Sequence, residues 1–542
     1  MKKYILNHKL LMLVNIIFIV AVSVIQTLQA ILFKTIVDTA VGNLSYSINV
    51  LMIYAIIFLI SVFVCEILSK ISIAALNKEV MIDYKKDIIE SFINADGHNR
   101  LTSSELISLL NNDVKMVKEN YLSSITNVFQ DALLFIVALF LLLHINVRLT
   151  LAIIVFGWIP VVIPQLLTKK NQALKAEYLH KLEKFTNRIK EIAQGFEVIK
   201  GFNIEDKIIS MTLEDDIQSE IEGYKFNVLQ GFQGALSIVL GFAIFFVNLL
   251  IASYLVINDY MTIGSMIAAV QLMNYIVNPI ISISTYGIKM RSVTKIIDTI
   301  QREVINIVDL DVIQGVQEFR FKNSIDVVDL NYSYDQQRDV LAGISMELEK
   351  GKKYALIGES GCGKTTLLKA LIRQINNYRG KIIFDDVNIR DFDSKSYYRK
   401  VSIIHQKVFM FKDTLRNNIC LYNECIEEKL NKVLKQSGII QIVKKLPHGL
   451  DTIVGEGGVE LSGGEMQRIA IARALIKDIE VLLIDEATSS LDKVTAREIE
   501  KTLVNLDATL LTVTHKLDLN ILSNYDKLFV MKDGKIVESG NL

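Results

Sequence analysis

Residues 355–371 read ALIGESGCGKTTLLKAL and carry the most specific pattern in the 542-residue chain. Gly358 and the triplet Gly363-Lys364-Thr365 match G-x-x-x-x-G-K-[ST] between an apolar strand-like run and an amphipathic helix-like run. The glycines let the backbone curl until several N–H groups point at one phosphate, and the N-terminus of the following helix adds positive potential. We therefore expect a nucleoside triphosphate site in which Lys364 contacts the β- and γ-phosphates and the Thr365 hydroxyl binds Mg²⁺. This loop alone leaves kinases, GTPases and ATPases open.

Two acidic residues close the apolar run in VLLIDEATSSLD, residues 481–492. Such a run predicts a buried parallel strand that delivers Asp485 beside the metal, with Glu486 next to it. A carboxylate that holds Mg²⁺ and a carboxylate that orients or deprotonates water form a phosphoryl-hydrolysis pair. Gln406 and His515 follow two further strand-like runs. We expect Gln406 to reach the metal and the water, and His515 to contact the γ-phosphate and fix Glu486. A structural role is the alternative for His515.

A second glycine-rich stretch, LSGGEMQRIAIARAL at residues 461–475, precedes a predicted helix. Ser462, Gly463 and Gly464 stand at the expected N-terminus of that helix and form another anion cradle. One nucleotide needs only one phosphate loop, so the second cradle needs a γ-phosphate held by another chain. We therefore predict a two-fold dimer in which each cradle closes over the nucleotide of its partner. A second copy of this chain is favoured, and a different partner chain is possible.

Length and composition set the class of protein. The chain is too long for one domain, 51% of its residues are hydrophobic, and its formal net charge is zero, which gives no support for a nucleic-acid partner. The cysteines form no C-x-x-C pair and no metal-ligand cluster in the sequence: Cys65, Cys362, Cys420 and Cys425. We interpret them as isolated reduced thiols.

Hydrophobic residues concentrate in the first part of the chain, which predicts a transmembrane domain over residues 1–305 and a nucleotide-binding domain over residues 306–542. Six stretches are long enough to cross a bilayer as helices: residues 10–34, 49–69, 124–145, 149–168, 234–257 and 261–286. Short loops follow the first, third and fifth stretches, whereas long loops rich in lysine follow the second and fourth. By the positive-inside rule, the long loops, both termini and the C-terminal domain are cytoplasmic. The compact layout favours a bacterial plasma membrane.

A few polar side chains interrupt the predicted spans: Glu66, Asp131, Asn248, Gln271, Asn274 and Asn278. Polar groups are costly in hydrocarbon and usually face a cavity or a partner. Gln271, Asn274 and Asn278 share one face of the sixth span, where they either line a substrate pathway or hydrogen-bond to other helices. Glu66 favours a cationic or peptide-like cargo if it faces a cavity. The alternative is an ion pair with Lys70, one helical turn further on.

These motifs, in this order, resemble an ATP-binding cassette (ABC) transporter half of the six-span exporter type, and the resemblance covers almost the whole chain. The matching elements are the phosphate loop, the signature, the D-loop, the Q-loop, the H-loop and the adenine-stacking tyrosine: residues 358–366, Leu461–Glu465, Ser489–Asp492, Gln406, His515 and Tyr334. Tyr332 is the second choice for the tyrosine. Glu465 stands where the family usually has Gln, which places an acidic group near an anion site.

The resemblance implies an all-α six-helix transmembrane domain followed by an α/β P-loop nucleotide-binding domain with a RecA-like core and a helical subdomain. It also implies ATP and Mg²⁺ as cofactors. The implied catalytic residues are Glu486, His515 and Gln406, and the implied metal ligands are Thr365, Gln406 and Asp485. The implied nucleotide-binding residues are Tyr334, Gly358, Glu359, Ser360, Gly361, Cys362, Gly363, Lys364, Thr365, Thr366, Gln406, Ser462, Gly463, Gly464 and Asp485.

The function that follows is ATP-driven export of a peptide, a lipid or an amphipathic small molecule across a lipid bilayer by alternating access. Import on the same scaffold, for example of metal chelates, is the alternative. Six spans exclude a soluble cassette ATPase, and a P-loop kinase would lack the second cradle. A membrane-anchored regulator that senses ATP without moving cargo stays open.

Overall fold

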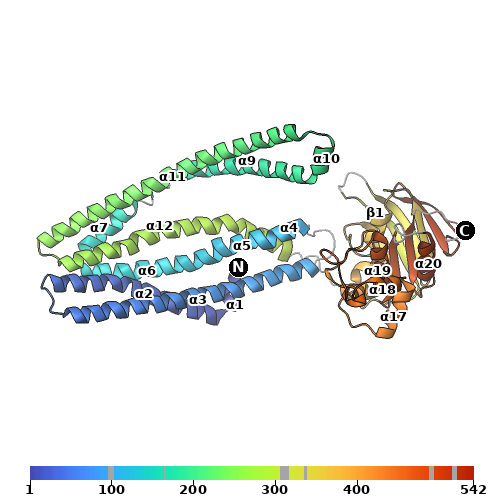
Figure 1. Ribbon diagram of the computed structural model, residues 1–542, viewed down its shortest axis with the longest axis horizontal. Coiled ribbons are helices and arrows are strands. Elements are labelled where there is room, and N and C mark those ends of the chain that lie inside the picture. The colour runs from blue at the N-terminus through green and yellow to red at the C-terminus, as the bar shows by residue number, and fades with distance from the viewer. Residues whose placement is uncertain are drawn as a thin grey trace. The chain divides into compact units, whose positions relative to one another are not determined.

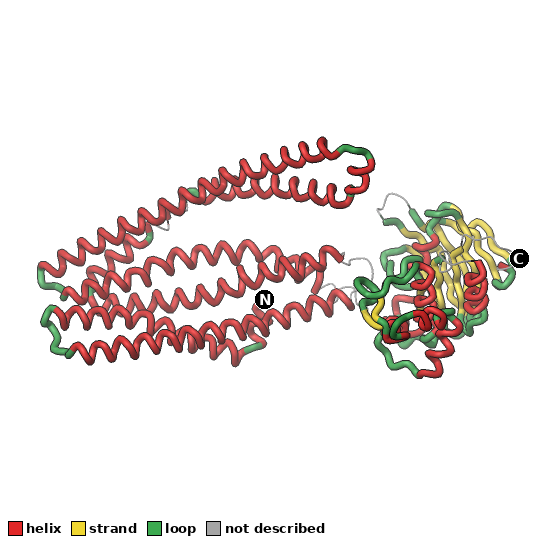
Figure 2. The backbone as a smooth tube through the Cα atoms, viewed as in Figure 1, coloured by secondary structure: helices red, strands yellow, loops and turns green. Residues whose placement is uncertain are grey.

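The computed structural model describes residues 1–94, 103–159, 162–163, 166–305, 317–334, 339–486, 493–514 and 522–541, and the chain forms two compact units (Figure 1). The first unit comprises Met1–Ile89 with Ser103–Gln301, and the second comprises Glu90–Thr102 with Arg302–Leu542. Among the described residues, the first unit is helical and the second contains the strands (Figure 2). The division after Gln301 lies close to the domain boundary expected at residues 305 and 306, which stays a prediction.

In its described residues, the first unit is built mainly from long helices. In chain order they are α1 (Lys2–Asn7), α2 (Lys9–Ala40), α3 (Ile48–Asn94), α4 (Ser103–Ser108), α5 (Val114–Val117), α6 (Ser123–Ile145), α7 (Val147–Gly157), α9 (Thr168–Gln194), α10 (Phe196–Gly201), α11 (Glu205–Ile257) and α12 (Ile263–Ile300). Five described segments are long and apolar enough to cross a membrane: Lys9–Ala40, Ile48–Ile93, Glu105–Ile145, Glu205–Ile257 and Ile263–Ile300. They correspond to five of the six expected spans.

The remaining expected span, residues 149–168, is described only in part. Its first half forms α7, an apolar helix of 11 residues. Residues 160–161 and 164–165 lie outside the described part of the chain, and α9 begins at Thr168. The sixth crossing therefore stays a prediction.

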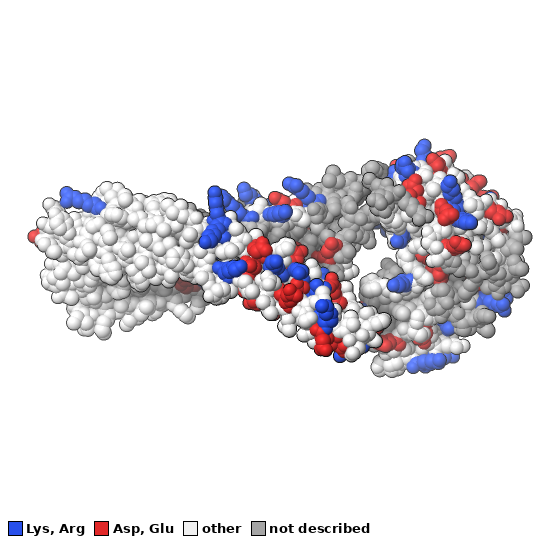
Figure 3. Space-filling model, turned by 90° about the horizontal axis from the view of Figure 1, so that it is seen from above, with Lys and Arg blue, Asp and Glu red and all other residues white. Residues whose placement is uncertain are grey.

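The surface of the helical unit is adapted to hydrocarbon. Large apolar side chains point outward, with Leu10 at 77%, Phe140 at 70% and Leu250 at 71% exposure. Small residues such as Ala138 and Ala268 are fully buried where helices pack, which lets the backbones approach closely. Figure 3 shows a broad zone of this unit with almost no Lys, Arg, Asp or Glu, beside a zone where these residues gather. This arrangement is that of a membrane-embedded bundle with polar extensions.

An ion-pair cluster holds the polar extensions of α9 and α11 together. The carboxylate of Asp215 on α11 lies 2.7 Å from the Lys184 ammonium and 3.3 Å from Nε of Arg188, both on α9. The hydrogen bond from Lys184 is the main reason why the pKa of Asp215 lies below its ordinary value. Tyr178 and Phe226 stack nearby with ring centroids 6.4 Å apart. The two extensions therefore carry both charged and aromatic contacts along their shared face.

A buried carboxylate joins the end of α2 to the start of α12. Asp38 is 3% exposed and accepts hydrogen bonds from the Thr262 hydroxyl and the Gly264 backbone N–H, each at 3.1 Å. A Cβ atom at Gly264 would lie 2.6 Å from both Cγ of Asp38 and the carbonyl oxygen of Lys34, so glycine permits the close approach. Asp38 thus satisfies N-terminal groups of a helix more than two hundred residues away in sequence.

The second unit contains two principal sheets. The strands of the larger sheet have the spatial order β12 (Lys535–Gly540), β11 (Lys527–Lys532), β3 (Lys353–Gly358), β10 (Thr509–Thr514), β9 (Val481–Asp485) and β6 (Val401–Ile404). All of these pairings are parallel except that of β12 with β11. An antiparallel sheet has the order β2 (Leu341–Glu349), β1 (Ser324–Tyr332), β4 (Arg379–Phe384) and β5 (Val387–Asn388). A short pair consists of β7 (Asp413–Thr414) and β8 (Ile453–Val454).

Helices complete the unit around two hydrophobic cores. They are α14 (Lys364–Leu371), α15 (Ser394–Lys400), α16 (Leu415–Cys420), α17 (Glu427–Gln436), α18 (Ile440–Lys445), α19 (Gly463–Leu475) and α20 (Lys493–Val504). One core joins the antiparallel sheet to the larger sheet and contains the edge-to-face rings of Phe319, Phe384 and Tyr397. The other joins the larger sheet to α16, α17 and α19 through residues such as Leu430 and Ile469. The parallel strands thus have their carboxyl ends along one edge, where ligands of open α/β sheets bind.

We expect Asp38→Ala to destabilise the helical unit, because the start of α12 and the Thr262 hydroxyl lose a buried acceptor. Losing a helix cap and leaving a buried donor unpaired costs roughly 1–3 kcal/mol. The melting temperature of the purified protein in detergent measures this. Asp38→Asn keeps one side-chain oxygen as an acceptor and should lose less. An unchanged melting temperature in Asp38→Ala would contradict the capping role.

Candidate active site

The phosphate loop between β3 and α14 depends on glycine at three positions. A Cβ atom at Gly358 would lie 2.3 Å from the carbonyl oxygen of Met531 on β11. Gly361 and Gly363 have φ angles of +82° and +107°, in the region that side chains disfavour. A Cβ atom at Gly363 would also lie 2.6 Å from the carbonyl oxygen of Val340. The loop is therefore curled and packed close to backbone, as a phosphate cradle requires.

Lys364 extends into this loop from the first position of α14. It is 5% exposed, and its ammonium group donates to the carbonyl oxygens of Gly358 at 2.8 Å and Glu359 at 2.7 Å. The loop therefore encloses a positive charge and the N-terminus of a helix at the same place. This donor set fits the phosphates of a nucleoside triphosphate.

Two oxygen-bearing side chains meet beside the loop. The Thr365 hydroxyl lies 3.3 Å from Oδ1 of Asp485, which ends β9 and is 7% exposed. Every residue of β9 is buried, so the strand fixes the position of this carboxylate. A hydroxyl and a carboxylate are hard oxygen ligands of the kind that Mg²⁺ prefers, and the pair fits this ion.

Glu486 is held in an uncommon backbone conformation next to Asp485. Its φ is +53°, and its backbone N–H donates to the carbonyl oxygen of Val513 on β10 at 3.3 Å. The side-chain amide of Gln406 donates to Oε2 of Glu486 at 3.1 Å. Positive φ in a residue with a side chain is strained and often marks a functional site. The backbone conformation and the Gln406 amide together fix the position of the Glu486 carboxylate.

The two candidate tyrosines differ in exposure. Tyr334 is 56% exposed and its hydroxyl lies 3.4 Å from the hydroxyl of Thr366 in the phosphate loop. Tyr332 is 3% exposed, and its ring packs edge-to-face against that of Tyr334 with centroids 5.0 Å apart. Only the ring of Tyr334 is therefore both accessible and close to the loop, which supports it as the stacking surface for a base.

The second cradle is formed by the start of α19. Ser462 caps this helix by accepting from the backbone N–H of Glu465, while Oε2 of Glu465 accepts from the backbone N–H and the hydroxyl of Ser462, each at 2.9 Å. This reciprocal arrangement is a capping box. It gives Glu465 a structural role that the sequence analysis missed, although the S-x-x-E pattern signals it. The same contact holds a carboxylate against the donors that an incoming γ-phosphate would use.

The structure thus brings most of the expected residues of one site together. Hydrogen bonds join three pairs of expected residues: Thr365 with Asp485, Gln406 with Glu486, and Tyr334 with Thr366. The Lys364 ammonium donates within its own loop. Within the described residues, the side-chain hydrogen bonds of Ser462 stay within the start of α19. His515 and the Ser489–Asp492 segment lie outside the described residues and stay predictions.

Sequence reasoning also missed a polar neighbour of the site. His405, directly before Gln406, lies near enough to Asp485 and Lys369 for their charges to affect it. Partial burial is the main reason why the pKa of His405 is lowered, and the Asp485 carboxylate opposes this effect. A neutral imidazole beside Asp485 is therefore favoured at neutral pH. The sequence signal was its position at the end of the same apolar strand as Gln406.

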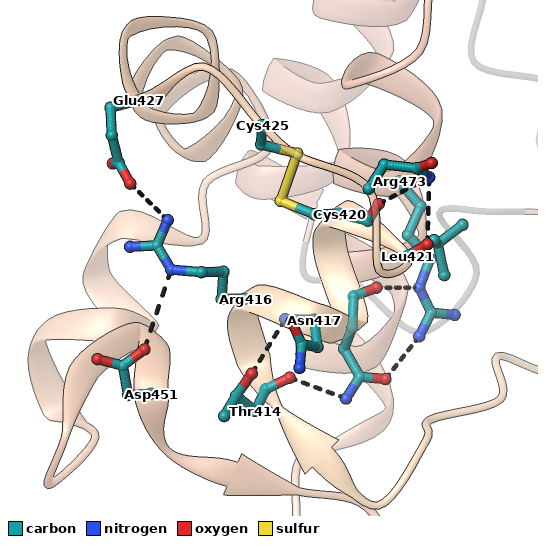
Figure 4. Close-up of a disulfide and its surroundings, with 11 residues drawn as sticks. Thr414, Arg416, Asn417, Cys420, Leu421, Cys425, Glu427, Asp451 and Arg473 are labelled. Atoms are coloured by element: carbon teal, nitrogen blue, oxygen red, sulfur yellow. Dashed lines mark hydrogen bonds and ion pairs between the residues drawn. A yellow bond between two sulfur atoms is a disulfide. The ribbon is translucent and has the colours of Figure 1, made fainter.

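The interpretation of all four cysteines as isolated thiols is wrong for two of them. Cys420, the last residue of α16, forms a disulfide with Cys425 (Figure 4), whereas Cys65 and Cys362 are free. Leu421, with φ of +50°, reverses the chain directly after α16, and the two Cα atoms lie 6.2 Å apart. That separation lies within the range that a disulfide can bridge. The pairing results from a backbone conformation that the spacing of the cysteines does not reveal.

Comparisons with known proteins match both parts of the chain. The ABC transporter model matches residues 341–489, and the model of the ABC transporter transmembrane region matches residues 12–280. ATP-dependent lipid A-core flippases of Desulfotalea psychrophila and Shewanella frigidimarina are 31% and 28% identical over 468 and 493 residues. These alignments cover 82% and 88% of this chain and 78% and 80% of the relatives.

A solved structure matches nearly the whole chain. A bacterial Atm1-family ABC exporter with ATP bound is similar with a TM-score of 0.82 and 21% sequence identity, over 98% of this chain and 94% of that chain. Together with the family models, this likeness confirms the expected fold class, a helical transmembrane domain followed by an α/β nucleotide-binding domain.

We expect Glu465→Gln to lower the ATP concentration for half-maximal ATPase activity, roughly three- to tenfold, because a charge that repels phosphate is removed and tenfold corresponds to about 1.4 kcal/mol. Glutamine preserves the capping box. ATPase titrations of the purified protein measure the change. Glu465→Ala serves as the control, since it removes both the charge and the side-chain half of the capping box and should lower the melting temperature. A half-maximal concentration unchanged in Glu465→Gln would contradict the repulsion.

Proposed function

Because the chain belongs to the ABC transporter family, we propose that it works as a homodimeric exporter that moves an amphipathic lipid or lipid-like molecule out of a bacterial cytoplasmic membrane. Its nucleotide-binding domain couples ATP hydrolysis to transport, as in the family. The lipid A-core flippases among its relatives support a lipid cargo. The comparisons give no support to the alternative of an importer.

The observation that carries this proposal is the pair of carboxylates at the end of β9, each joined by a hydrogen bond to a side chain from another element. Thr365 and Asp485 supply oxygen ligands for Mg²⁺, which when bound neutralises charge on the transferred phosphoryl group. The Gln406 amide holds Glu486 in place to orient a water molecule and accept its proton. Lys364 carries the positive charge for the phosphates within the loop.

The second cradle supports a dimer. Ser462 and the two following glycines present the N-terminus of α19, a helix of 13 residues, as an anion-binding surface. The phosphate loop of the same chain already has its own helix N-terminus at α14. A two-fold partner therefore gives each nucleotide two helix termini, and ATP binding favours the closed dimer. Both kinds of half-site stand on this one chain, which favours a second copy over a different subunit.

We place both termini and the nucleotide-binding domain on the cytoplasmic side of the membrane. The support is the lysine-rich composition of the long loops, which include α9 and the first part of α11. The short connection between α11 and α12 then lies on the opposite side, together with Asp38 and Thr262. The chain is a multi-pass membrane protein with bacterial relatives, so the bacterial cell membrane is the expected location.

Polar contacts between the membrane helices support a cargo pathway near α2, α3 and α12. The Gln26 amide on α2 donates to Oε1 of Glu66 on α3 at 2.7 Å. One turn further along α2, Gln29 accepts from the Tyr275 hydroxyl of α12 at 3.4 Å. These contacts join three helices through groups that hydrocarbon disfavours. They give the pathway one carboxylate, Glu66, whose hydrogen-bond partner is Gln26 rather than Lys70.

Three of the other intramembrane amides divide into two groups. Asn248 is buried, and its amide donates to the carbonyl oxygen of Ile244 and to Sδ of Met273, which supports a role between helices. Asn274 and Asn278 of α12 are exposed within the single chain and are free to face cargo or the partner subunit. We assign Asn274 and Asn278, with Glu66, to the pathway.

We expect Glu486→Gln to lower ATP turnover at least a hundredfold while ATP binding persists, because general-base catalysis contributes about 10²–10⁴-fold. Phosphate release by the chain expressed alone in lipid vesicles measures turnover, and a fluorescent nucleotide measures binding. Lys364→Ala is the contrasting variant and should weaken binding itself. Near wild-type turnover in Glu486→Gln would overturn the assignment. Wild-type turnover no higher than that of Glu486→Gln, with ATP bound, would exclude a self-sufficient homodimer.

We expect Glu66→Gln to reduce the preference for a cationic over a neutral cargo about tenfold, the equivalent of about 1.4 kcal/mol of charge interaction. The ratio of transport rates is measured with two fluorescent lipids that differ only in an ammonium or a hydroxyl head group. The vesicles carry the protein with its nucleotide-binding domain on the outside, where ATP is added. Lys70→Gln is the matched control and should leave the ratio unchanged. An unchanged ratio in Glu66→Gln would remove Glu66 from the pathway.

A further inference from the structure

A basic pocket lies at the edge of the larger sheet opposite the phosphate loop. Its volume is about 620 Å³, and its lining includes Lys395, Arg399, Lys400, Lys477, Cys420 and Cys425. α15 leads directly into β6, and the residues around Lys477 lead into β9. The pocket therefore lies at the amino ends of these two strands. The nucleotide site lies at their carboxyl ends, where Asp485 is the last residue of β9 and Gln406 comes shortly after β6.

The pocket carries an excess of unpaired positive charge. Within the described part of the chain, the side chains of Lys395, Arg399 and Lys477 make no ion pair or hydrogen bond, whereas Lys400 pairs with Glu480 at 3.3 Å. Burial lowers the pKa of Lys477, and no acidic partner opposes this. The field of three free cations favours an anionic ligand.

Two acidic side chains also line the pocket. Asp478 is neutralised by Lys429 at 2.8 Å, and Glu424, on the loop between the two cysteines, makes no ion pair among the described residues. The free charges of the lining are thus three positive and one negative. The net charge that faces a ligand stays positive.

The disulfide forms part of the same lining. Cys420 is 4% exposed, whereas Cys425 is half-buried and is the more accessible residue of the pair. Cations beside a cysteine stabilise its thiolate, which is both the attacking and the leaving species in thiol–disulfide exchange. Under the topology proposed above, this domain faces the cytoplasm, where disulfides are usually transient and redox-sensing.

We propose that Cys420 and Cys425 form a reversible disulfide whose reductant is an anionic low-molecular-weight thiol bound in this basic pocket. The thiolate attacks Sγ of Cys425, the S–S bond breaks, and Sγ of Cys420 leaves with the electron pair and takes up a proton. A second thiolate attacks the sulfur of the first on the mixed disulfide and releases Cys425, which is also protonated. Two thiols are thereby oxidised to one small disulfide, and the protein gains two electrons and two protons.

The helix that carries Cys420 is held without the disulfide. Asn418 of α16 is fully buried, and it accepts from the backbone N–H and donates to the carbonyl oxygen of Phe411, both at 2.9 Å. Arg473 of α19 donates to the carbonyl oxygens of Asn418 and Phe409 at 2.6 and 2.7 Å (Figure 4 shows Arg473 beside α16). Reduction therefore releases the loop after α16 and leaves the helix in place.

The experiment compares three thiols of similar size that differ in charge: mercaptoethanesulfonate, mercaptoethanol and cysteamine. The full-length protein is oxidised, exposed to each thiol, and analysed by differential alkylation of the peptides that carry Cys420 and Cys425. Each rate is divided by the rate at which the same thiol reduces a neutral small disulfide. We expect the normalised rate of the sulfonate to exceed that of cysteamine about tenfold at low salt, and the gap to shrink at about 0.5 M salt.

Charge variants show whether the pocket causes the difference. A triple variant should make the three normalised rates equal: Lys395→Gln, Arg399→Gln and Lys477→Gln. A control triple variant removes three exposed cations elsewhere in the same domain: Lys381→Gln, Lys532→Gln and Lys535→Gln. It should preserve the difference between the normalised rates of the sulfonate and cysteamine. Lys477→Gln alone, expected to narrow the gap at least twofold, serves if the triple variant fails to fold.

Two results would overturn the proposal. One is an equal normalised rate for all three thiols in the wild-type protein, and the other is a failure of Cys420 and Cys425 to pair under oxidation. Neither readout depends on ATP turnover or transport. The disulfide proposal and the exporter proposal therefore fail or stand separately.

Discussion

The parallel pairing of β9 between β10 and β6 is the constraint from which the nucleotide site follows. Asp485 is aligned with Val513 on β10, and Ile484 is aligned with Ile404 on β6. Because parallel strands end at the same edge, side chains from distant parts of the sequence reach one place without long loops. β9 is buried along its whole length, so a shift of register would move Asp485 away from Thr365 and expose apolar residues.

The two units expose different kinds of side chain to their surroundings. In the nucleotide-binding unit, apolar side chains are buried in two cores and polar groups remain outside. In the membrane unit, large apolar side chains also cover the exterior, while Ala and large apolar residues fill the buried positions, and partly buried polar pairs such as Gln26 with Glu66 join helices. A polar pair inside hydrocarbon contributes specificity of helix contact, because each member left alone would be costly.

The sequence predicts what depends on local geometry. The phosphate loop, the carboxylates at the end of β9 and the glycine-rich start of α19 are each set by a few consecutive residues, and the family and the fold class expected from them are confirmed. Contacts between distant residues escaped prediction. Glu66 is hydrogen-bonded to Gln26 on another helix rather than to Lys70 on its own helix, and Asp38 bonds to the start of α12. Packing between helices decided these contacts, and spacing along a single helix did not reveal them.

The disulfide escaped prediction for a different reason. Its two cysteines meet because Leu421 and Tyr422 both have positive φ angles, and neither residue type signals such a turn. The residues of the D-loop and His515 stay predictions from sequence. The roles of the site residues rest on geometry and remain proposals, whereas the importer alternative has lost its support.

The buried cap at Asp38 also limits how the membrane unit is able to open. If α2 and α12 separated at this end, the buried Asp38 carboxylate would lose the Gly264 amide and the Thr262 hydroxyl, which is costly for a buried charge. The close approach at Gly264 leaves no room there for a larger side chain. We therefore expect the two helices to move together at this end, so that, under the topology proposed above, an exit on the outer side of the membrane runs along another seam of the bundle.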